Sequence, residues 1–224
     1  MSNPYPQTLV EVVRGVDRTL FEDYVKPKVT HFIALIRKGV LESNVDWFET
    51  PRPTEVRQYI HEILISLVAI HAQVSATSRA LLERTLAALI VEIVNEALLC
   101  FRQISRFGMG GMLRVCLISA SQIVVSLMIF VKATLEIEFM HQTVVQYVNK
   151  PASNTFTEIY TTISKAYQRR PGADGDLQKE LDGVKRTLHE TRRVTAIEYL
   201  CFKAPRKKKD NDAAGGNSEA SSAT

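Results

Sequence analysis

The stretch Thr54-Glu-Val-Arg-Gln-Tyr-Ile-His-Glu-Ile-Leu-Ile-Ser-Leu-Val-Ala-Ile-His-Ala-Gln-Val74 decides the fold. Its aliphatic residues recur every three or four positions, at Val56, Ile60, Ile63, Leu67, Ile70 and Val74. This spacing places them on one side of an α-helix, whereas a half-buried strand would alternate apolar and polar residues. Thr54 is the expected N-cap, because its hydroxyl can accept a bond from a free backbone N–H. The stretch therefore predicts a helix that contributes one face to a core.

The same spacing continues on both sides of this stretch. The predicted core rows are Leu9, Val13, Val16, Leu20 and Tyr24; Val29, Ile33 and Ile36; Leu82, Leu86, Leu89, Ile93, Ala97, Cys100 and Ile104; Ile137, Met140, Val144 and Tyr147; Phe156, Ile159, Ile163 and Tyr167; and Leu177, Leu181, Val184, Leu188, Thr191 and Val194. We find no strand alternation and no internal repeat. The fold class is all-α, an antiparallel helical bundle or a rod of stacked helical hairpins.

Breaks between the helices are expected at glycine, proline and serine clusters within residues 7–202. Pro27 should kink or restart its helix, and Gly39 is a candidate C-cap. The further breaks are Val45–Pro53, where Trp47 should anchor the loop to the helices, Ser75–Ser78, a hinge at Gly108–Gly111, a turn at Asn149–Ser153 followed by a capping box at Thr155 and Glu158, and Arg169–Gly175. Residues 204–224 have no apolar pattern and are predicted to be a disordered, basic and Ser-rich tail. The predicted domains are a helical rod over 1–203 and this tail.

One long uncharged run interrupts the pattern. Val115–Val131 is 17 residues without a charged side chain, in a chain of which 23% of the residues are charged. A membrane span needs about 20 apolar residues, with roughly 17 the lower limit. Ser119, Ser121 and Gln122 dilute a run of this length. A buried helix is the second interpretation, but the run is apolar on all sides, unlike an outer helix of a rod.

We favour a third interpretation, in which residues 115–132 are a translated intron. Val115-Cys116 can be encoded by GTATGT, a fungal donor site, and Leu127-Met128 by CTAATG, which contains a branch-point-like CTAAT. Lys132 can be AAG, which ends in the AG of an acceptor site. Joining Arg114 directly to Ala133 places Leu113, Leu135 and Phe139 on one helical row. An insert of 18 residues is also about five helical turns, so periodicity alone does not exclude it.

Composition excludes several classes of protein. The chain has 224 residues and a net charge of +4, half of which lies in the last 22 residues. The body is therefore too balanced to predict a nucleic-acid surface. Cys100, Cys116 and Cys201 are odd in number and far apart, which indicates a reducing compartment rather than a disulfide framework or a zinc site. The N-terminus lacks the pattern of a signal peptide. We expect a cytoplasmic protein.

The search for chemistry predicts a non-enzyme. His61-Glu62 begins like a metalloprotease helix, but Ile65 occupies the position of the second histidine ligand. Gly108–Gly111 lacks the Lys-Ser/Thr ending of a phosphate loop. The remaining histidines have no ligand spacing and fall on different predicted helices: His31, His71, His141 and His189. No nucleophile, base and orienting group come together. We therefore predict no catalytic, cofactor-binding or metal-binding residues, no cofactor, no nucleic acid and no small-molecule substrate.

Six segments resemble one family of proteins, the Sec-five subunits of the exocyst (exocyst complex component two) in their fungal form. The resemblance is to the C-terminal helical region and spans about residues 17–203. The segments are Leu20–Lys28 (LFEDYVKPK), Asp46–Glu55 (DWFETPRPTE), Arg106–Arg114 (RFGMGGMLR), Ala133–Thr143 (ATLEIEFMHQT), Ala166–Gly172 (AYQRRPG) and Thr195–Phe202 (TAIEYLCF). In the family pattern the Met-Leu-Arg segment runs directly into Ala-Thr-Leu-Glu, so Val115–Lys132 is foreign to it.

The resemblance implies helical bundles stacked into a rod. It also implies assembly with other exocyst subunits, which tether secretory vesicles to the plasma membrane during exocytosis. The expected location is the cytoplasm, peripheral at plasma-membrane sites of exocytosis. A small GTPase and an anionic membrane surface are further candidate partners, the latter through Arg206–Lys209. The alternative is a small membrane-anchored helical protein that spans the bilayer at 115–131, which would stay in the pellet after an alkaline wash.

Deleting residues 115–132 should raise the soluble yield and the melting temperature of the chain. If the segment continued a helix, it would displace Ala133 by about 27 Å along the axis. If it looped out, its large apolar side chains would face water and promote aggregation. Both quantities are measured against the full-length chain, by quantifying soluble protein and by thermal unfolding. A deleted chain that no longer folds would show that the segment is a core helix.

Overall fold

The structure, a computed structural model, describes residues 5–43, 45–50, 53–111, 135–167 and 177–203. They form the helices α1 (Tyr5–Val40), α2 (Gln58–Thr77), α3 (Leu82–Arg102), α5 (Glu136–Val144), α6 (Lys150–Ala166) and α7 (Leu177–Val194), with short 3₁₀ turns at Arg79–Leu81, Val145–Tyr147 and Leu200–Phe202. Within these ranges no strand is present, and a single isolated bridge joins Phe107 to Tyr167. The predicted all-α fold is confirmed. Residues 112–134 and 204–224, with the predicted insert and tail, lie outside the described residues.

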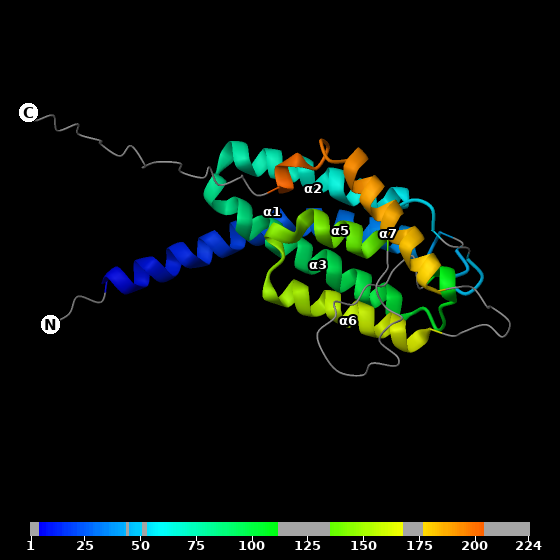
Figure 1. The fold of residues 1–224 in the computed structure, drawn as a ribbon. Helices are drawn as coiled ribbons and strands as arrows, with labels where there is room; N and C mark the ends of the chain where they lie inside the picture. The colour runs from blue at the N-terminus through cyan, green and yellow to red at the C-terminus, as the bar shows by residue number, and fades with distance from the viewer. Residues whose placement is uncertain (1–4, 44, 51–52, 112–134, 168–176, 204–224) are drawn as a thin grey trace, which may run out of the picture.

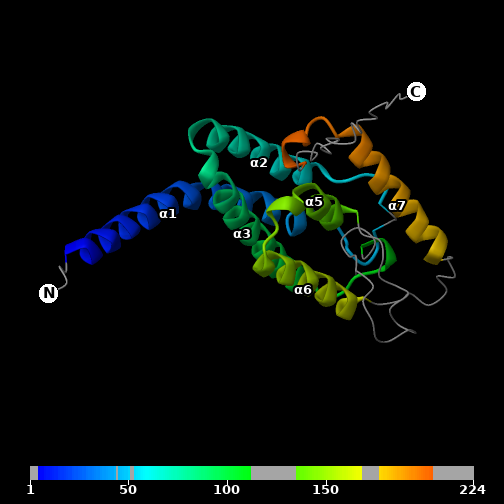
Figure 2. The same cartoon turned by 60° about the vertical axis from the view of Figure 1, so that its left-hand side comes forward.

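Helix α3 is the centre of the bundle. It packs between α1 and α6. The turn at Arg79–Leu81 joins it to α2, which lies beside it. Figures 1 and 2 show α5 and α7 on the α2 side of this centre, while the N-terminal half of α1 projects away from the bundle. Residues on more than one side of α3 are buried, for example Leu89 and Ile93, and also Val94 and Phe101. A helix buried on several sides must be apolar around most of its circumference, which explains its central position.

Most predicted core rows are buried as expected. All six residues of the deciding stretch, from Val56 to Val74, are buried, and so are the central members of the α3, α5 and α6 rows. On α7, Val184 and Leu188 are buried, but the prediction for Val194 is wrong, because 66% of this residue is exposed. At this point the chain leaves the helix for the turn that precedes Tyr199.

The predictions for α1 are the least accurate. Leu9, Val13, Val16 and Leu20 are exposed rather than in a core, because no described part of the chain covers that side of the helix. Pro27 does not break or restart the helix, which runs without interruption from Tyr5 to Val40. The proline removes one intrahelical hydrogen bond, while packing of the following residues, such as Phe32, holds the backbone helical.

Helix boundaries differ from the predicted ones in three places. Gly39 is not a C-cap; it is helical, and a Cβ there would lie 2.3 Å from the ring of Tyr59, so close packing requires the glycine. Thr54 is not the N-cap of α2, which begins at Gln58 after Arg57. The turn at Asn149 is confirmed, but α6 begins there, with the Asn149 side chain accepting from the Ala152 N–H at 3.0 Å. The predicted capping box at Thr155 is therefore wrong.

Trp47 anchors the long loop between α1 and α2, as predicted. It is 7% exposed, its indole N–H donates to the carbonyl of Val40 at 3.2 Å, and its ring meets Phe101 and Phe107 edge-on. Gly108 and Gly111 lie against this loop: a Cβ at either would be 2.0 Å from the carbonyl oxygen of Phe48 or Trp47. These glycines therefore permit a close approach of two backbone segments. The predicted hinge at this place remains a prediction.

A buried ion pair joins three parts of the chain. Arg57 donates from Nε and Nη2 to the Glu136 carboxylate at 2.7 and 2.9 Å, and its Nη1 donates to the Gly39 carbonyl at 2.8 Å. The hydroxyl of Tyr59 donates to the same carboxylate at 2.9 Å. Glu136 is fully buried, at the first residue of α5, where the helix dipole favours a negative charge.

Burial and the interactions with Glu136 together set the protonation of Arg57 and Tyr59. Burial alone would lower the pKa of Arg57, but the bonds and charge of Glu136 outweigh it, so the pKa is raised. Burial, and then the charge of Glu136, raise the pKa of Tyr59 well above its ordinary value. Arg57 is therefore a permanent cation, and Tyr59 is a permanent hydrogen-bond donor to the carboxylate.

Replacing Leu67 or Leu89 with Ala should lower the free energy of unfolding by about 2–5 kcal/mol, because each side chain fills a packed core. The two leucines are 1% and 0% exposed. Ile65→Ala on α2 is the matched control, since this residue is 53% exposed and should cost less than about 0.5 kcal/mol. Urea unfolding measures the free energy of unfolding of all three variants and of the unchanged chain. Losses below about 0.5 kcal/mol at both leucines would show that the assigned core faces are wrong.

Replacing Glu136 with Gln should cost about 3–5 kcal/mol, because it leaves the guanidinium of Arg57 buried without a counter-charge. Glu158→Gln is the control: Glu158 pairs with Arg102 at the surface, where both side chains are about half exposed, and the expected loss is below about 1 kcal/mol. Equal losses in urea unfolding for the two variants would contradict the role assigned to the buried pair.

Candidate interaction surfaces

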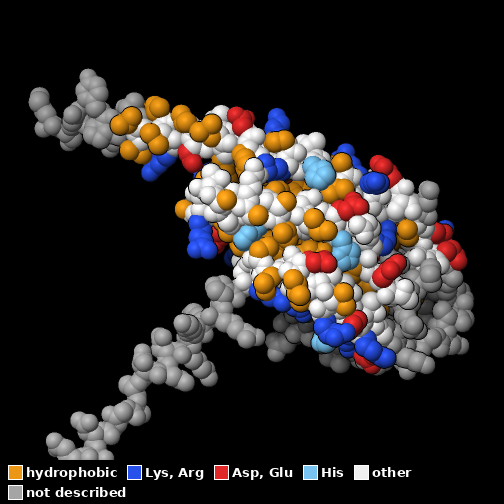
Figure 3. All heavy atoms as spheres, turned by 90° about the horizontal axis from the view of Figure 1, so that it is seen from above, with side chains coloured by type: hydrophobic (Ala, Val, Ile, Leu, Met, Phe, Trp, Pro, Cys, Tyr) orange, Lys and Arg blue, Asp and Glu red, His pale blue; other side chains and the backbone are white. Residues whose placement is uncertain are grey.

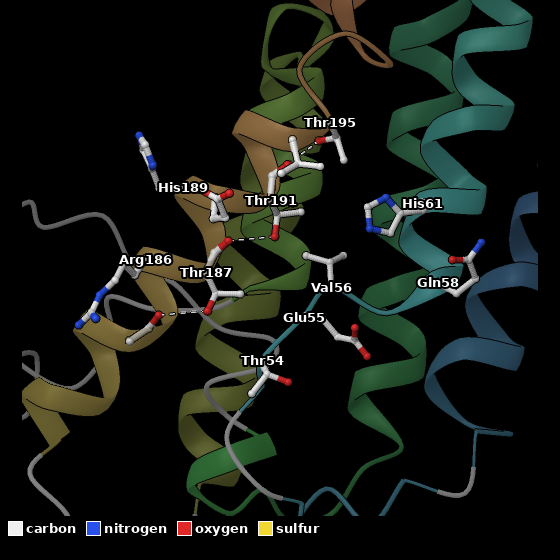
Figure 4. Close-up of a pocket in the computed structure, with 13 residues that line it drawn as sticks. Thr54, Glu55, Val56, Gln58, His61, Arg186, Thr187, His189, Thr191 and Thr195 are labelled. Atoms are coloured by element: carbon white, nitrogen blue, oxygen red, sulfur yellow. Dashed lines mark hydrogen bonds between the residues drawn. The ribbon is translucent and has the colours of Figure 1, made fainter.

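An open groove of about 940 Å³ lies between α7 and the segment that leads into α2 (Figure 4). Residues 54–61 form one wall and residues 183–195 the other. The lining residues are Thr54, Glu55, Val56, Gln58, His61, Gly183, Arg186, Thr187, His189, Glu190, Thr191, Val194 and Thr195. Its volume exceeds those of the other pockets among the described residues.

Three threonines line the α7 wall of the groove. The hydroxyls of Thr187, Thr191 and Thr195 each donate to the carbonyl four residues earlier, at 3.2, 2.9 and 2.8 Å. Figure 4 shows these three bonds as dashed lines that follow one another along the chain. A hydroxyl that donates to its own helix keeps only acceptor capacity for a ligand. These threonines therefore offer methyl groups and weak acceptors, while Arg186, His189 and Glu190 add polar and charged groups to the same wall.

His61 faces these threonines from α2 (Figure 4). Its Nδ1 lies 2.9 Å from the hydroxyl of Tyr199, and its ring packs against Phe139 and stacks on Tyr199. Burial lowers the pKa of His61, and the charge of Glu198 opposes this shift. The ring therefore favours the neutral form and joins α2 to the C-terminal turn. This packing role accounts for a histidine that resembles the start of a zinc motif, and Ile65 on the next turn is exposed.

One charged residue of the groove, Glu190, forms an ion pair with Arg193, which lies outside the groove lining. Glu190 accepts from Arg193 at 2.6 and 2.9 Å, and these bonds lower the pKa of the Glu190 carboxyl. A proton donor or acceptor in catalysis needs a pKa near the working pH, which a paired surface carboxylate does not have. Glu190 is therefore unsuited to proton transfer near neutral pH.

The structure separates the other candidate residues from one another. His31 lies on α1, His71 packs against Tyr147 and Phe202, and His141 stacks on Phe156. Cys100 is buried, and burial, followed by the charge of Glu96, raises the pKa of its thiol to about 12. Within the described ranges no three His, Cys, Asp or Glu side chains lie close enough to hold a metal ion.

Sequence reasoning missed two exposed apolar surfaces. The first is the projecting half of α1, where hydrophobic side chains gather (Figure 3). The second, which we call the C-terminal apolar patch, comprises Val194, Ile197 and Leu200, of which Ile197 is 86% exposed. An apolar row predicts burial whether the covering partner is the same chain or another one, so the sequence contains no signal that separates the two cases.

One helix among the described residues, α2, is long and apolar enough to cross a membrane. Seven of its 20 residues are buried in the bundle. Core helices meet the same criteria of length and composition, so this finding carries no conclusion about a membrane. The alternative span at 115–131 lies outside the described residues.

Comparison with known proteins shows similarity to one protein family. The model of the family described as "Exocyst complex component Sec5" matches residues 3–202. Exocyst complex component 2 of Homo sapiens is 26% identical over 199 residues, which cover 88% of this chain and 18% of that protein. The Drosophila melanogaster protein of the same name is 23% identical over 203 residues, 89% of this chain and 20% of that protein.

A plant relative matches a shorter part. Exocyst complex component SEC5A of Arabidopsis thaliana is 28% identical over 92 residues, 41% of this chain and 8% of that protein. No solved structure gives a significant match. The chain thus spans about a fifth of the human and fly relatives' length. Since the family model covers residues 3–202 of 224, the chain belongs to the Sec5 family of exocyst complex components.

Proposed function

We propose that the chain is a helical segment of an exocyst subunit and helps to tether secretory vesicles to the plasma membrane through protein–protein contacts. Other exocyst subunits are its partners, and it acts in the cytoplasm at sites of exocytosis. Residues 1–203 act as one helical unit, and residues 204–224 form a tail. The proposal assigns no catalytic step, cofactor or metal to the chain.

The observation that carries this proposal is the family match over residues 3–202. The exposed apolar side chains on the surface support it. The groove beside α7 has threonine hydroxyls that donate to their own backbone, and its Glu190 carboxylate is paired with Arg193. In contrast, large aliphatic side chains are exposed in two places that can dock other helices. A protein that acts by assembly needs such surfaces, because apolar burial drives association.

An anionic membrane surface is a second candidate partner, at the C-terminal apolar patch. Val194, Ile197 and Leu200 are exposed there, and Arg192 and Lys203 are close to them in the sequence, whereas Arg193 is paired with Glu190. Aliphatic groups that can enter the lipid interface, flanked by basic side chains, are typical of peripheral membrane contacts. The contact with a small GTPase stays a prediction, without a surface assigned to it.

Co-expression with each of the other exocyst subunits of the same organism tests the main proposal. We expect the tagged chain to retain at least one subunit during affinity purification, and we expect Ile197→Asp to reduce the retained amount at least about fivefold if the C-terminal apolar patch forms the contact. Leu99→Asp, at a half-exposed leucine on α3, is the matched control for charge.

Retention of none of the subunits would reject the proposal. Retention that Ile197→Asp leaves unchanged would place the contact elsewhere on the chain. Sedimentation with vesicles containing phosphatidylserine, compared with neutral vesicles, separates the membrane contact from the protein contact. Binding to anionic vesicles that Ile197→Asp abolishes would support the second candidate, and equal sedimentation with both vesicle types would reject it.

A further inference from the structure

A second groove, of about 630 Å³, lies between α5 and the segment that leads from the end of α7 into the C-terminal turn. Residues 139–146 form one wall and residues 189–203 the other. We call it the basic groove, because Arg192, Arg193 and Lys203 line it and no aspartate or glutamate of the described residues does. A hollow lined by charges of one sign attracts a ligand of the opposite sign.

The base of the basic groove is apolar. Phe139, Tyr199 and Phe202 line it, and each of them is at most 4% exposed. The rings of Phe139 and Tyr199 meet edge-on, with their centroids 6.0 Å apart. At the rim, Val145 is 57% exposed. A ligand that fills the groove therefore needs apolar groups in addition to negative charge.

Two hydrogen bonds join the walls of the basic groove. Arg192 Nη1 donates to Gln142 Oε1 at 2.6 Å, and Gln146 Nε2 donates to the carbonyl of Cys201 at 3.3 Å. The two glutamines are four residues apart, so the bonds are about one helical turn apart along the same wall. A groove that is held in shape before binding loses little conformational freedom when a ligand enters, which favours affinity.

The bond to Gln142 also fixes the position of the Arg192 guanidinium. The Gln142 side-chain amide donates to the Glu138 carboxylate, which also accepts from the Tyr160 hydroxyl at 3.2 Å. The amide oxygen is therefore directed at Arg192. A guanidinium has five N–H donors, and Gln142 occupies one of them.

Arg192 and Lys203 are the cations that can bind a new partner. Within the described ranges neither of them forms an ion pair with a carboxylate. Arg193 differs, because Glu190 pairs with it at 2.6 Å. A carboxylate that binds Arg192 can form two parallel N–H···O bonds, whereas Lys203 offers a single mobile charge.

We infer, on the basis of the proposed function, that the basic groove binds an acidic amphipathic helix of another exocyst subunit. Carboxylates of this helix bind Arg192 and Lys203, and its aliphatic side chains pack on Val145 and on the aromatic base. Residues 139–146 extend about 10 Å along the wall at 1.5 Å per residue, which corresponds to about two turns of a bound helix. An amphipathic helix that lies in a groove is a common mode of recognition.

The shape of the basic groove favours a protein segment over an anionic membrane. Lipid contacts are made by apolar side chains that project into the headgroup region. Phe139, Tyr199 and Phe202 are instead buried at the base, where only a side chain that enters the groove reaches them. The charge of the groove decides the character of this segment, since Arg192 and Lys203 attract acidic side chains and repel basic ones.

Charge reversal in the full chain tests this binding. The probe is each exocyst subunit that the unchanged chain retains on co-expression, purified, with its affinity measured by isothermal titration calorimetry. Arg192→Glu combined with Lys203→Glu should weaken binding at least about tenfold, because carboxylates would then face carboxylates. The matched control combines Lys38→Glu with Lys165→Glu, at exposed lysines of α1 and α6 outside the groove, and should leave the affinity unchanged. Circular dichroism and the melting temperature check that both variants fold.

Carbodiimide cross-linking tests the contact itself, because this reagent joins an amine to a carboxylate that pairs with it. In the complex we expect Lys203 to form a covalent link to an aspartate or glutamate of the retained subunit, identified by mass spectrometry. Lys203→Arg is the control. It keeps the positive charge but lacks the reactive amine, so it should bind with unchanged affinity and lose the link.

Three results would overturn the inference. In the first, both double variants weaken binding equally, or neither does. In the second, the complex forms but Lys203 gives no link. In the third, the chain alone sediments with phosphatidylserine vesicles, and the Arg192 and Lys203 reversals abolish this sedimentation but leave subunit binding unchanged, which would assign the groove to lipid. Retention of no subunit at all would reject the proposed function and the inference together, so the two failures are distinguishable.

Discussion

The buried pair of Arg57 and Glu136 is the constraint on which the rest of the bundle depends. The two residues are far apart in the sequence, and the guanidinium also holds the end of α1 through the carbonyl of Gly39. One cation therefore fixes the relative positions of α1, α2 and α5. The Glu136 side chain is fully buried and that of Arg57 is 17% exposed, so the pair has lost most of its hydration. Such a pair is stabilising only when its geometry is satisfied in full. Tyr59 supplies the additional donor that the buried carboxylate requires.

The helical rows show how much of the fold follows from local patterns. The row from Val56 to Val74 predicted both a helix and its buried face, because a helix in the core of a bundle must be apolar on the side that meets its neighbours. The Arg57–Glu136 pair could not be predicted in this way. Spacing within one helix does not specify which charged residue on a distant helix will share its environment.

The errors have a common physical origin. Local rules predicted a helix cap at Gly39 and a helix break at Pro27. In the structure, tertiary packing determines why a glycine occupies position 39 and why the helix continues through Pro27. The glycine accommodates the ring of Tyr59, and the proline is tolerated within a helix that neighbouring residues hold in place. The apolar row of α1 from Leu9 to Leu20 was assigned to a core for the same reason, since periodicity reports an apolar side and not the molecule that covers it. The surfaces that matter for assembly are therefore the ones that a single sequence identifies least well.

The continuity of α1 through Pro27 makes the helix a lever. Its C-terminal half is embedded in the bundle, where Ile36 and Val40 are buried, and no break separates this half from the tip. Asp17 and Tyr24 still contact α3 and α2, through Arg84 and Gln73. About 12 residues lie beyond these contacts, and at 1.5 Å per residue they extend about 18 Å. A rotation of about 10° at the held end would move the tip by about 3 Å over that length. Whatever binds the tip therefore senses small repacking of the core as a large displacement, and a load on the tip acts directly on the core.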